Sequence, residues 1–117
     1  MDHISKPYIA KGAMEPWKSL MSELALFPNV VCKISGLVTE ANWYDWKVQD
    51  FKPFTDHLLE IFTPQRLMFG SDWPVATLGG TYGQVIDLAE QLTLGLSPSE
   101  GEHFWSKTAI HAYNLAL

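Results

Sequence analysis

Residues 67–75 read LMFGSDWPV, and this stretch indicates the fold more directly than any other part of the chain. An apolar run of three residues meets Gly70, and Asp72 then stands between Ser71 and Trp73. A short apolar run bounded by turn residues is typical of a strand buried on both faces of a parallel sheet. Asp72 is therefore either an ordinary turn residue or a reactive carboxylate held at the end of a strand.

The rest of the chain alternates strand patterns with helix patterns. Residues 29–37, NVVCKISGL, form a second expected strand, and residues 2–7, DHISKP, read as the end of another strand running into a loop. The helical patterns cover residues 14–27, 51–62, about 81–93 and the segment from Pro98 to about residue 113. Strands that alternate with helices predict βαβ units, and hence an α/β fold with a parallel sheet.

Two helix boundaries carry a specific signal. SPSE at residues 97–100 predicts a capping box, with Ser97 as the N-cap, Pro98 in the first helical position and Glu100 in the third. Gly95 is the expected C-terminal cap of the preceding helix. These signals place the start of the last helix and the end of the helix before it.

The composition of the chain argues against several classes of function. The chain has 117 residues, the size of one domain, and its formal net charge of -5 without a basic cluster argues against nucleic acid and anionic membranes as partners. No apolar run approaches the roughly 20 residues that span a bilayer. A single cysteine, Cys32, excludes an internal disulfide and a cysteine-built zinc site. This use of cysteine fits a reducing compartment, so we expect a cytoplasmic protein.

The number of strands is small for a parallel sheet. Two full strands and one strand end cannot close a sheet, and an open sheet this narrow leaves long edges unpaired. We therefore expect residues 1–117 to form a single domain from which part of the fold is missing. Such edges favour pairing with a second copy, so a homo-oligomer is expected.

Three polar stretches stand at the carboxyl ends of the expected strands, where parallel α/β proteins collect reactive groups. His3 can bind a metal, hold a carbonyl or move a proton, or it can be an ordinary hydrogen-bonded histidine. Asp2 is disfavoured as its orienting partner because adjacent strand residues point to opposite faces. Asp72 can act as a general base toward water or as a metal ligand.

Candidate substrate-binding residues come from the same strand ends. Lys33 either faces inward, where it polarises a carbonyl or pairs with a carboxylate, or extends its charged end into solvent. Trp43 belongs to an aromatic connection over residues 38–50 that forms a substrate wall or packs against another subunit. Trp73, next to Asp72, is the third candidate for substrate binding.

The stretches DHISKP, VVCKISGLVTEANW, RLMFGSDWPV and TYGQV together resemble the C-terminal part of the lactonase branch of the amidohydrolase superfamily, which includes L-fuconolactonase and 2-pyrone-4,6-dicarboxylate lactonase types. The resemblance implies strands six to eight, with their helices, of a TIM (β/α)₈ barrel. It implies that His3 serves as metal ligand or substrate-orienting group. It also implies that Asp72 activates the hydrolytic water and contacts a divalent metal, zinc, where one is present.

Two functional hypotheses follow from this resemblance. In the first, the chain belongs to a hydrolase that opens a small-molecule lactone, of sugar or pyrone type, with water activated by Asp72. In the second, the chain is an inactive truncated barrel that self-associates, because the His-x-His pair on the family's first strand is absent. Met1 stands where the family has an apolar strand residue, which favours a truncated gene model or a true fragment.

Overall fold

The computed structural model describes residues 1–117 and contains a two-stranded parallel sheet. Strand β1 covers Cys32–Ile34 and strand β2 covers Leu67–Phe69, with Cys32 opposite Leu67 and Ile34 opposite Phe69. The parallel pairing confirms the expected α/β class. Both strands are shorter than the sequence indicates, since the backbone turns left-handed two residues after β1, at Gly36 with φ +64°.

The first residue extends this sheet on the side away from β2. The Met1 nitrogen donates to the Val31 carbonyl at 2.9 Å, and the Lys33 amide donates to the Met1 carbonyl at 2.9 Å. Met1 therefore lies beside β1 in the manner of a third strand, as the pattern of residues 2–7 predicts. The chain then leaves the sheet directly, in a 3-10 turn over His3–Ser5.

Helices occupy most of the remaining chain. They are α1 (Trp17–Ala25), α2 (Val48–Phe62), α3 (Tyr82–Leu92), α4 (Pro98–Glu102), a π-helical turn (His103–Lys107) and α5 (Thr108–Ala112). The predicted capping box of α4 is confirmed, with Ser97 and Glu100 each bonding the other's backbone amide. The prediction that Gly95 caps α3 is wrong. That helix already ends at Leu92, followed by Thr93, whose hydroxyl donates to the Ala89 carbonyl at 2.7 Å.

Helix α2 also departs from the predicted boundary, because it begins at Val48 and not at Phe51. The Asp50 carboxylate accepts a hydrogen bond from the Lys47 amide at 2.8 Å, which satisfies a backbone donor of the first turn. The first turn of α2 therefore forms without an apolar pattern in its sequence. Hydrophobic periodicity missed this turn because it does not detect a side chain that caps a helix.

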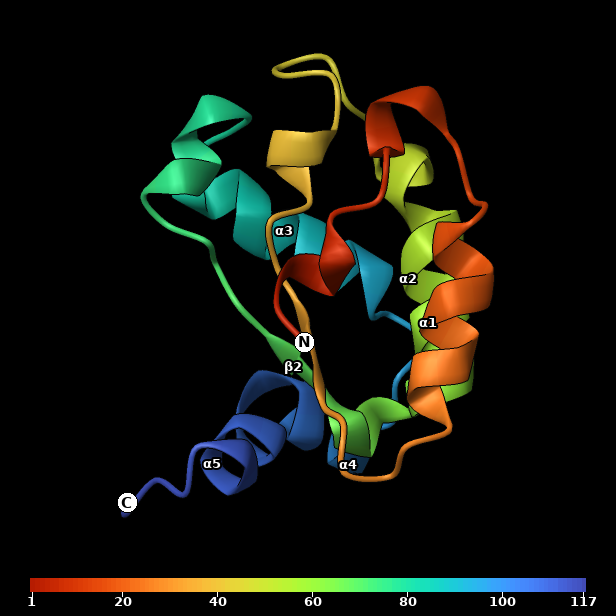
Figure 1. Cartoon of the computed structure of the whole chain (residues 1–117). Coiled ribbons are helices and arrows are strands. Elements are labelled where there is room, and N and C mark those ends of the chain that lie inside the picture. The colour runs from red at the N-terminus through yellow and green to blue at the C-terminus, as the bar shows by residue number, and fades with distance from the viewer.

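The helices surround the sheet and bury its apolar side chains. In Figure 1, α1 and α2 lie side by side on one side of the sheet, α3 crosses behind it, and α4 and α5 lie near its other end. The core is completed by side chains from the turn His3–Ser5, the strands, α2 and the π-helical turn: Ile4, Cys32, Phe51, Phe54, Leu58, Phe62, Leu67 and Phe104. The carboxyl ends of both strands open toward the N-terminal segment, so they bring residues 3, 35 and 72 together. No helix is both long enough and apolar enough to span a membrane.

Candidate active site at the strand ends

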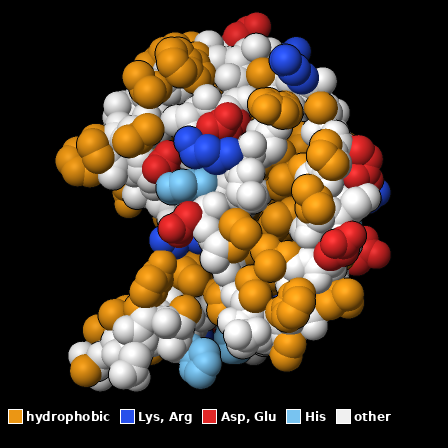
Figure 2. Space-filling model, in the orientation of Figure 1, with side chains coloured by type: hydrophobic (Ala, Val, Ile, Leu, Met, Phe, Trp, Pro, Cys, Tyr) orange, Lys and Arg blue, Asp and Glu red, His pale blue; other side chains and the backbone are white.

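His3 and Asp72 meet at the carboxyl ends of the strands, although 68 residues separate them in the sequence. The imidazole Nε2 lies 3.7 Å from the Asp72 carboxylate oxygen Oδ1, with 32% of the His3 side chain and 14% of the Asp72 side chain exposed. Figure 2 shows one histidine near the middle of this face, with acidic and basic side chains gathered around it. Both side chains are therefore partly buried but still accessible from solvent, so the pair can exchange protons with a bound molecule.

Ser35 orients the His3 ring. Its hydroxyl oxygen lies 2.8 Å from His3 Nδ1, and the residue is only 3% exposed. The sequence prediction missed Ser35. Its position carries a signal, because residues two apart on a strand point to the same face and Lys33 is already a candidate for that face. Asp2 is not the orienting partner, in agreement with the alternation argument.

The backbone of the N-terminal turn is left-handed over four successive residues, from His3 to Lys6, with φ between +43° and +62°. This conformation costs roughly 1–2 kcal/mol for each residue other than glycine, so surrounding contacts must hold it in place. Ile4 is fully buried, and its carbonyl accepts a hydrogen bond from the Trp17 indole at 2.7 Å. The Lys6 ammonium lies 3.3 Å from Glu40, which fixes the far end of the turn.

The Lys33 side chain contacts Asp2 and Tyr113, and not the His3–Asp72 pair. Its ammonium group lies 2.9 Å from Asp2 and 5.3 Å from the centre of the Tyr113 ring. Hydrogen bonds that the Lys33 ammonium donates to Tyr113 and Asp2 raise the pKa of Lys33, and the same bond and the Lys33 charge lower the pKa of Asp2. Of the roles expected for Lys33, the structure favours pairing with a carboxylate. The carboxylate is Asp2 and not Asp72, so a contact of Lys33 with substrate stays a prediction.

The two predicted substrate-binding tryptophans lie at the surface. Trp43 is 52% exposed and donates its indole N–H to the Thr39 carbonyl at 3.0 Å, and Trp73 is 64% exposed directly beside Asp72. By contrast, Trp46 of the same connection packs inward against Phe51 with ring centres 5.3 Å apart. Exposed indoles are available to a ligand or a partner, and substrate binding by Trp43 and Trp73 stays a prediction.

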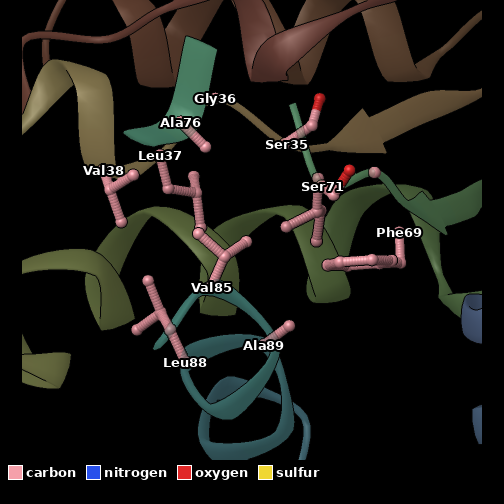
Figure 3. A pocket seen from close by; sticks show the side chains of 12 residues that line it. Ser35, Gly36, Leu37, Val38, Phe69, Ser71, Ala76, Val85, Leu88 and Ala89 are labelled. Carbon is pink, nitrogen blue, oxygen red and sulfur yellow. The ribbon is translucent and has the colours of Figure 1, made fainter. Parts of the chain in front are cut away.

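A small cavity lies behind the strand ends. It measures about 20 Å³ and lies between the sheet and α3. Figure 3 shows Ser35 and Ser71 on one side of it, with Leu37, Val38 and Leu88 on the other. This volume suits about one water molecule. The cavity is therefore too small for a lactone, and the exposed side of His3 and Asp72 is the side open to a larger molecule.

The predicted metal ligands supply two donors. His3 Nε2 is free to bind an ion when Nδ1 carries the proton and donates to Ser35, and the Asp72 carboxylate lies beside it. The structure contains no group of three histidine, cysteine or acidic residues able to hold a metal. Catalytic zinc takes three protein ligands, so the residues of this chain alone do not fit a complete zinc site.

Parallel strands joined by a helix, with a histidine and a carboxylate near their carboxyl ends, form a candidate site at the edge where parallel α/β proteins collect reactive groups. A family model described as amidohydrolase matches residues 1–115, and the chain belongs to the amidohydrolase family. It is 42% identical over 125 residues to L-fucono-1,5-lactonase of Burkholderia multivorans. That match covers 98% of this chain and 42% of the relative, so the chain spans about two fifths of its length.

Solved structures give the same result. A crystal structure of an amidohydrolase from Burkholderia multivorans with bound zinc superposes with a TM-score of 0.90 at 43% identity, over 98% of this chain and 43% of that one. A second structure, described as a 2-pyrone-4,6-dicarboxylic acid hydrolase from Pseudomonas putida, shares the fold, with a TM-score of 0.80 at 23% identity, over 99% of this chain and 42% of that one. The expected resemblance to the lactonase branch of the amidohydrolases is confirmed.

Proposed function

We propose that this chain carries part of the active site of a lactone hydrolase, and that its residues correspond to strands six to eight of a TIM barrel. The observation that carries the proposal is the half-buried pair of His3 Nε2 and Asp72 Oδ1, 3.7 Å apart at the strand ends. A relative that is 42% identical over nearly the whole chain is an L-fucono-1,5-lactonase, which supports a sugar 1,5-lactone as substrate.

The proposed reaction needs one base and one hydrogen-bond donor. Asp72 takes a proton from water as the water oxygen bonds to the lactone carbonyl carbon. The carbonyl oxygen becomes an oxyanion, which the N–H of His3 Nε2 stabilises. Collapse of this intermediate breaks the ring C–O bond, and the proton held by Asp72 passes to the departing alkoxide. The product is the open hydroxy acid, and Asp72 returns to its carboxylate form.

Other groups have lesser parts in this scheme. A divalent ion would polarise the carbonyl, but His3 and Asp72 offer only two donors for it, so no step depends on a metal here. Lys33 does not stabilise the oxyanion in this scheme, because Asp2 already holds its ammonium group. In this scheme Trp73, which is 64% exposed beside Asp72, would cover one face of the bound sugar.

Titration of released acid at constant pH tests the proposal, with L-fucono-1,5-lactone and a panel of sugar and pyrone lactones as substrates. We expect turnover above the rate without protein, and Asp72→Asn should reduce it by at least about 100-fold, since a positioned base contributes about 10²–10⁴-fold. Asp87→Asn, an exposed acid on α3, is the matched control and should keep full turnover. No turnover on any lactone would contradict the proposal for this chain and favour the inactive, self-associating alternative.

A further inference from the structure

Three side chains at the strand ends form a continuous row: the Ser35 hydroxyl, the His3 ring and the Asp72 carboxylate. The ring connects the other two, with Nδ1 2.8 Å from Ser35 Oγ and Nε2 3.7 Å from Asp72 Oδ1. A row of serine, histidine and aspartate invites comparison with the catalytic triad of serine hydrolases. In this chain, however, the serine is buried and the histidine lies between the serine and the aspartate through its two different ring nitrogens. The row therefore does not form a triad with a serine nucleophile.

Ser35 is unsuited to act as a nucleophile. Only 3% of the residue is exposed, and the cavity on its other side measures about 20 Å³, enough for about one water molecule. A lactone carbonyl cannot reach the hydroxyl from either side. The reactive nitrogen of the ring, Nε2, also faces away from Ser35 and toward Asp72.

A hydroxyl next to Nδ1 has a property that a carboxylate or a carbonyl lacks. It donates to Nδ1 when the ring proton is on Nε2, and it accepts from Nδ1 when the proton is on Nδ1 or on both nitrogens. Asp72 favours the first state, because its carboxylate oxygen lies 3.7 Å from Nε2 and attracts an N–H there. Ser35 can therefore keep the ring in place whichever nitrogen carries the proton.

The geometry points to Ser35 as a positioning residue that fixes the His3 ring through Nδ1 and keeps Nε2–H on the Asp72 side of the ring, where the proposed oxyanion would accept it. This inference rests on the proposed function for its value in catalysis, but the hydrogen bond itself can be tested without turnover. Ring nitrogens of histidine are read directly in 15N–1H correlation spectra. An acceptor nitrogen that loses its donor moves downfield, and the two nitrogens report which of them carries the proton.

The experiment records these spectra for the 117-residue chain at a pH about two units above the ordinary imidazole pKa of about 6.5. We expect the parent to show the proton on Nε2 and a hydrogen-bonded Nδ1. Ser35→Ala should move Nδ1 downfield, and Ser35→Thr, which keeps the hydroxyl, should restore the parent position. Asp72→Asn should leave Nδ1 bonded and reduce the preference for Nε2–H, because the carboxylate charge 3.7 Å from Nε2 is lost.

Turnover and labelling give independent outcomes. Where the chain hydrolyses a lactone, Ser35→Ala should lower kcat by about 10–100-fold with KM little changed, and Ser35→Thr should recover most of it. A sulfonyl fluoride probe should not modify Ser35, and an adduct on Ser35 by mass spectrometry would overturn the inference. A parent spectrum with a free Nδ1 would overturn it as well. A bonded Nδ1 in a chain without turnover would contradict the proposed function and leave the inference standing.

Discussion

The backbone of Gly36, just after β1, lies close against the His3 side chain. Gly36 has φ +64°, and a Cβ at this position would lie 3.0 Å from both Cβ and Nδ1 of His3. Gly36→Ala should therefore cost roughly 1–2 kcal/mol for the left-handed backbone alone, and it should also push the ring away from Ser35. Chemical unfolding and the 15N spectrum of His3 measure the two effects.

Gly12→Ala is the matched control for this substitution. Gly12 has nearly the same φ, +61°, but nothing lies within 4 Å of an added Cβ. It should lose a similar amount of stability from backbone strain and leave the His3 spectrum unchanged. If both variants left His3 undisturbed, the close approach of Gly36 to the ring would have no consequence for the site.

The Asp2–Lys33 pair makes stability depend on pH. Lys33 lowers the pKa of Asp2, so the contribution of this carboxylate is present above its unfolded pKa of about 3.9 and is lost as pH falls through the lower folded value. Asp2→Asn should therefore lower the Tm at neutral pH, and the difference from the parent should vanish in strong acid. The effect should be small, because the Asp2 side chain is 67% exposed.

Thermal unfolding between neutral pH and about pH 2, which lies below the ordinary carboxylate range, tests this prediction. Asp45→Asn is the control, since Asp45 is exposed and forms no ion pair in the structure. A difference between parent and Asp2→Asn that persisted unchanged in acid would show that the ion pair does not cause it.

At the scale of elements, the only arginine joins helices α1 and α2. The Arg66 guanidinium donates to the carbonyls of Ala25 at 2.9 Å, Phe27 at 3.0 Å and Val30 at 3.2 Å, and to Ile61 of α2 at 3.4 Å. It also lies 5.1 Å from the centre of the Phe62 ring. These bonds satisfy carbonyls at the end of α1 that the helix itself leaves free.

Arg66→Lys should therefore destabilise the fold although the charge is kept, because an ammonium group cannot reproduce the planar fork. We expect a loss of roughly 1.5–3 kcal/mol, the range for hydrogen bonds that involve a charged group. Urea unfolding measures it, and Lys11→Arg, at an exposed position, controls for a general effect of exchanging the two cations. Equal stability of Arg66→Lys and the parent would contradict this account.

The sequence predicts the elements better than it predicts their side-chain contacts. Alternating apolar runs and helical periods place the strands, the helices and the capping box of Ser97, and the strand-end rule places His3 beside Asp72. Ser35 and the left-handed turn at His3 escape prediction because both depend on contacts across more than 10 residues, such as the Trp17 bond to the Ile4 carbonyl. Local patterns do not encode such contacts.

For the whole molecule, packing of the helices offsets the small size of the sheet. The radius of gyration is 13.5 Å, close to the value of about 13.4 Å expected for an ordinary domain of this length. Helices therefore compact the chain even though only two strands pair. Trp105 of the π-helical turn packs on the Phe69 side chain of β2 with ring centres 4.8 Å apart. A second copy that paired with β2 would approach close to this aromatic contact.

We expect reversible self-association that grows with protein concentration and involves the β2 edge, because an edge strand exposes unpaired backbone groups. Trp105, which is 40% exposed, packs on the Phe69 side chain of this strand, so Trp105→Ala should open space beside β2 and shift the equilibrium toward the oligomer. Tyr8→Ala is the matched control, since it removes an aromatic side chain that is 67% exposed in the N-terminal segment. Sedimentation velocity over a wide concentration range measures all three proteins, with circular dichroism to verify folding. A folded Trp105→Ala variant that stayed as monomeric as the parent at every concentration would show that the β2 edge does not mediate association.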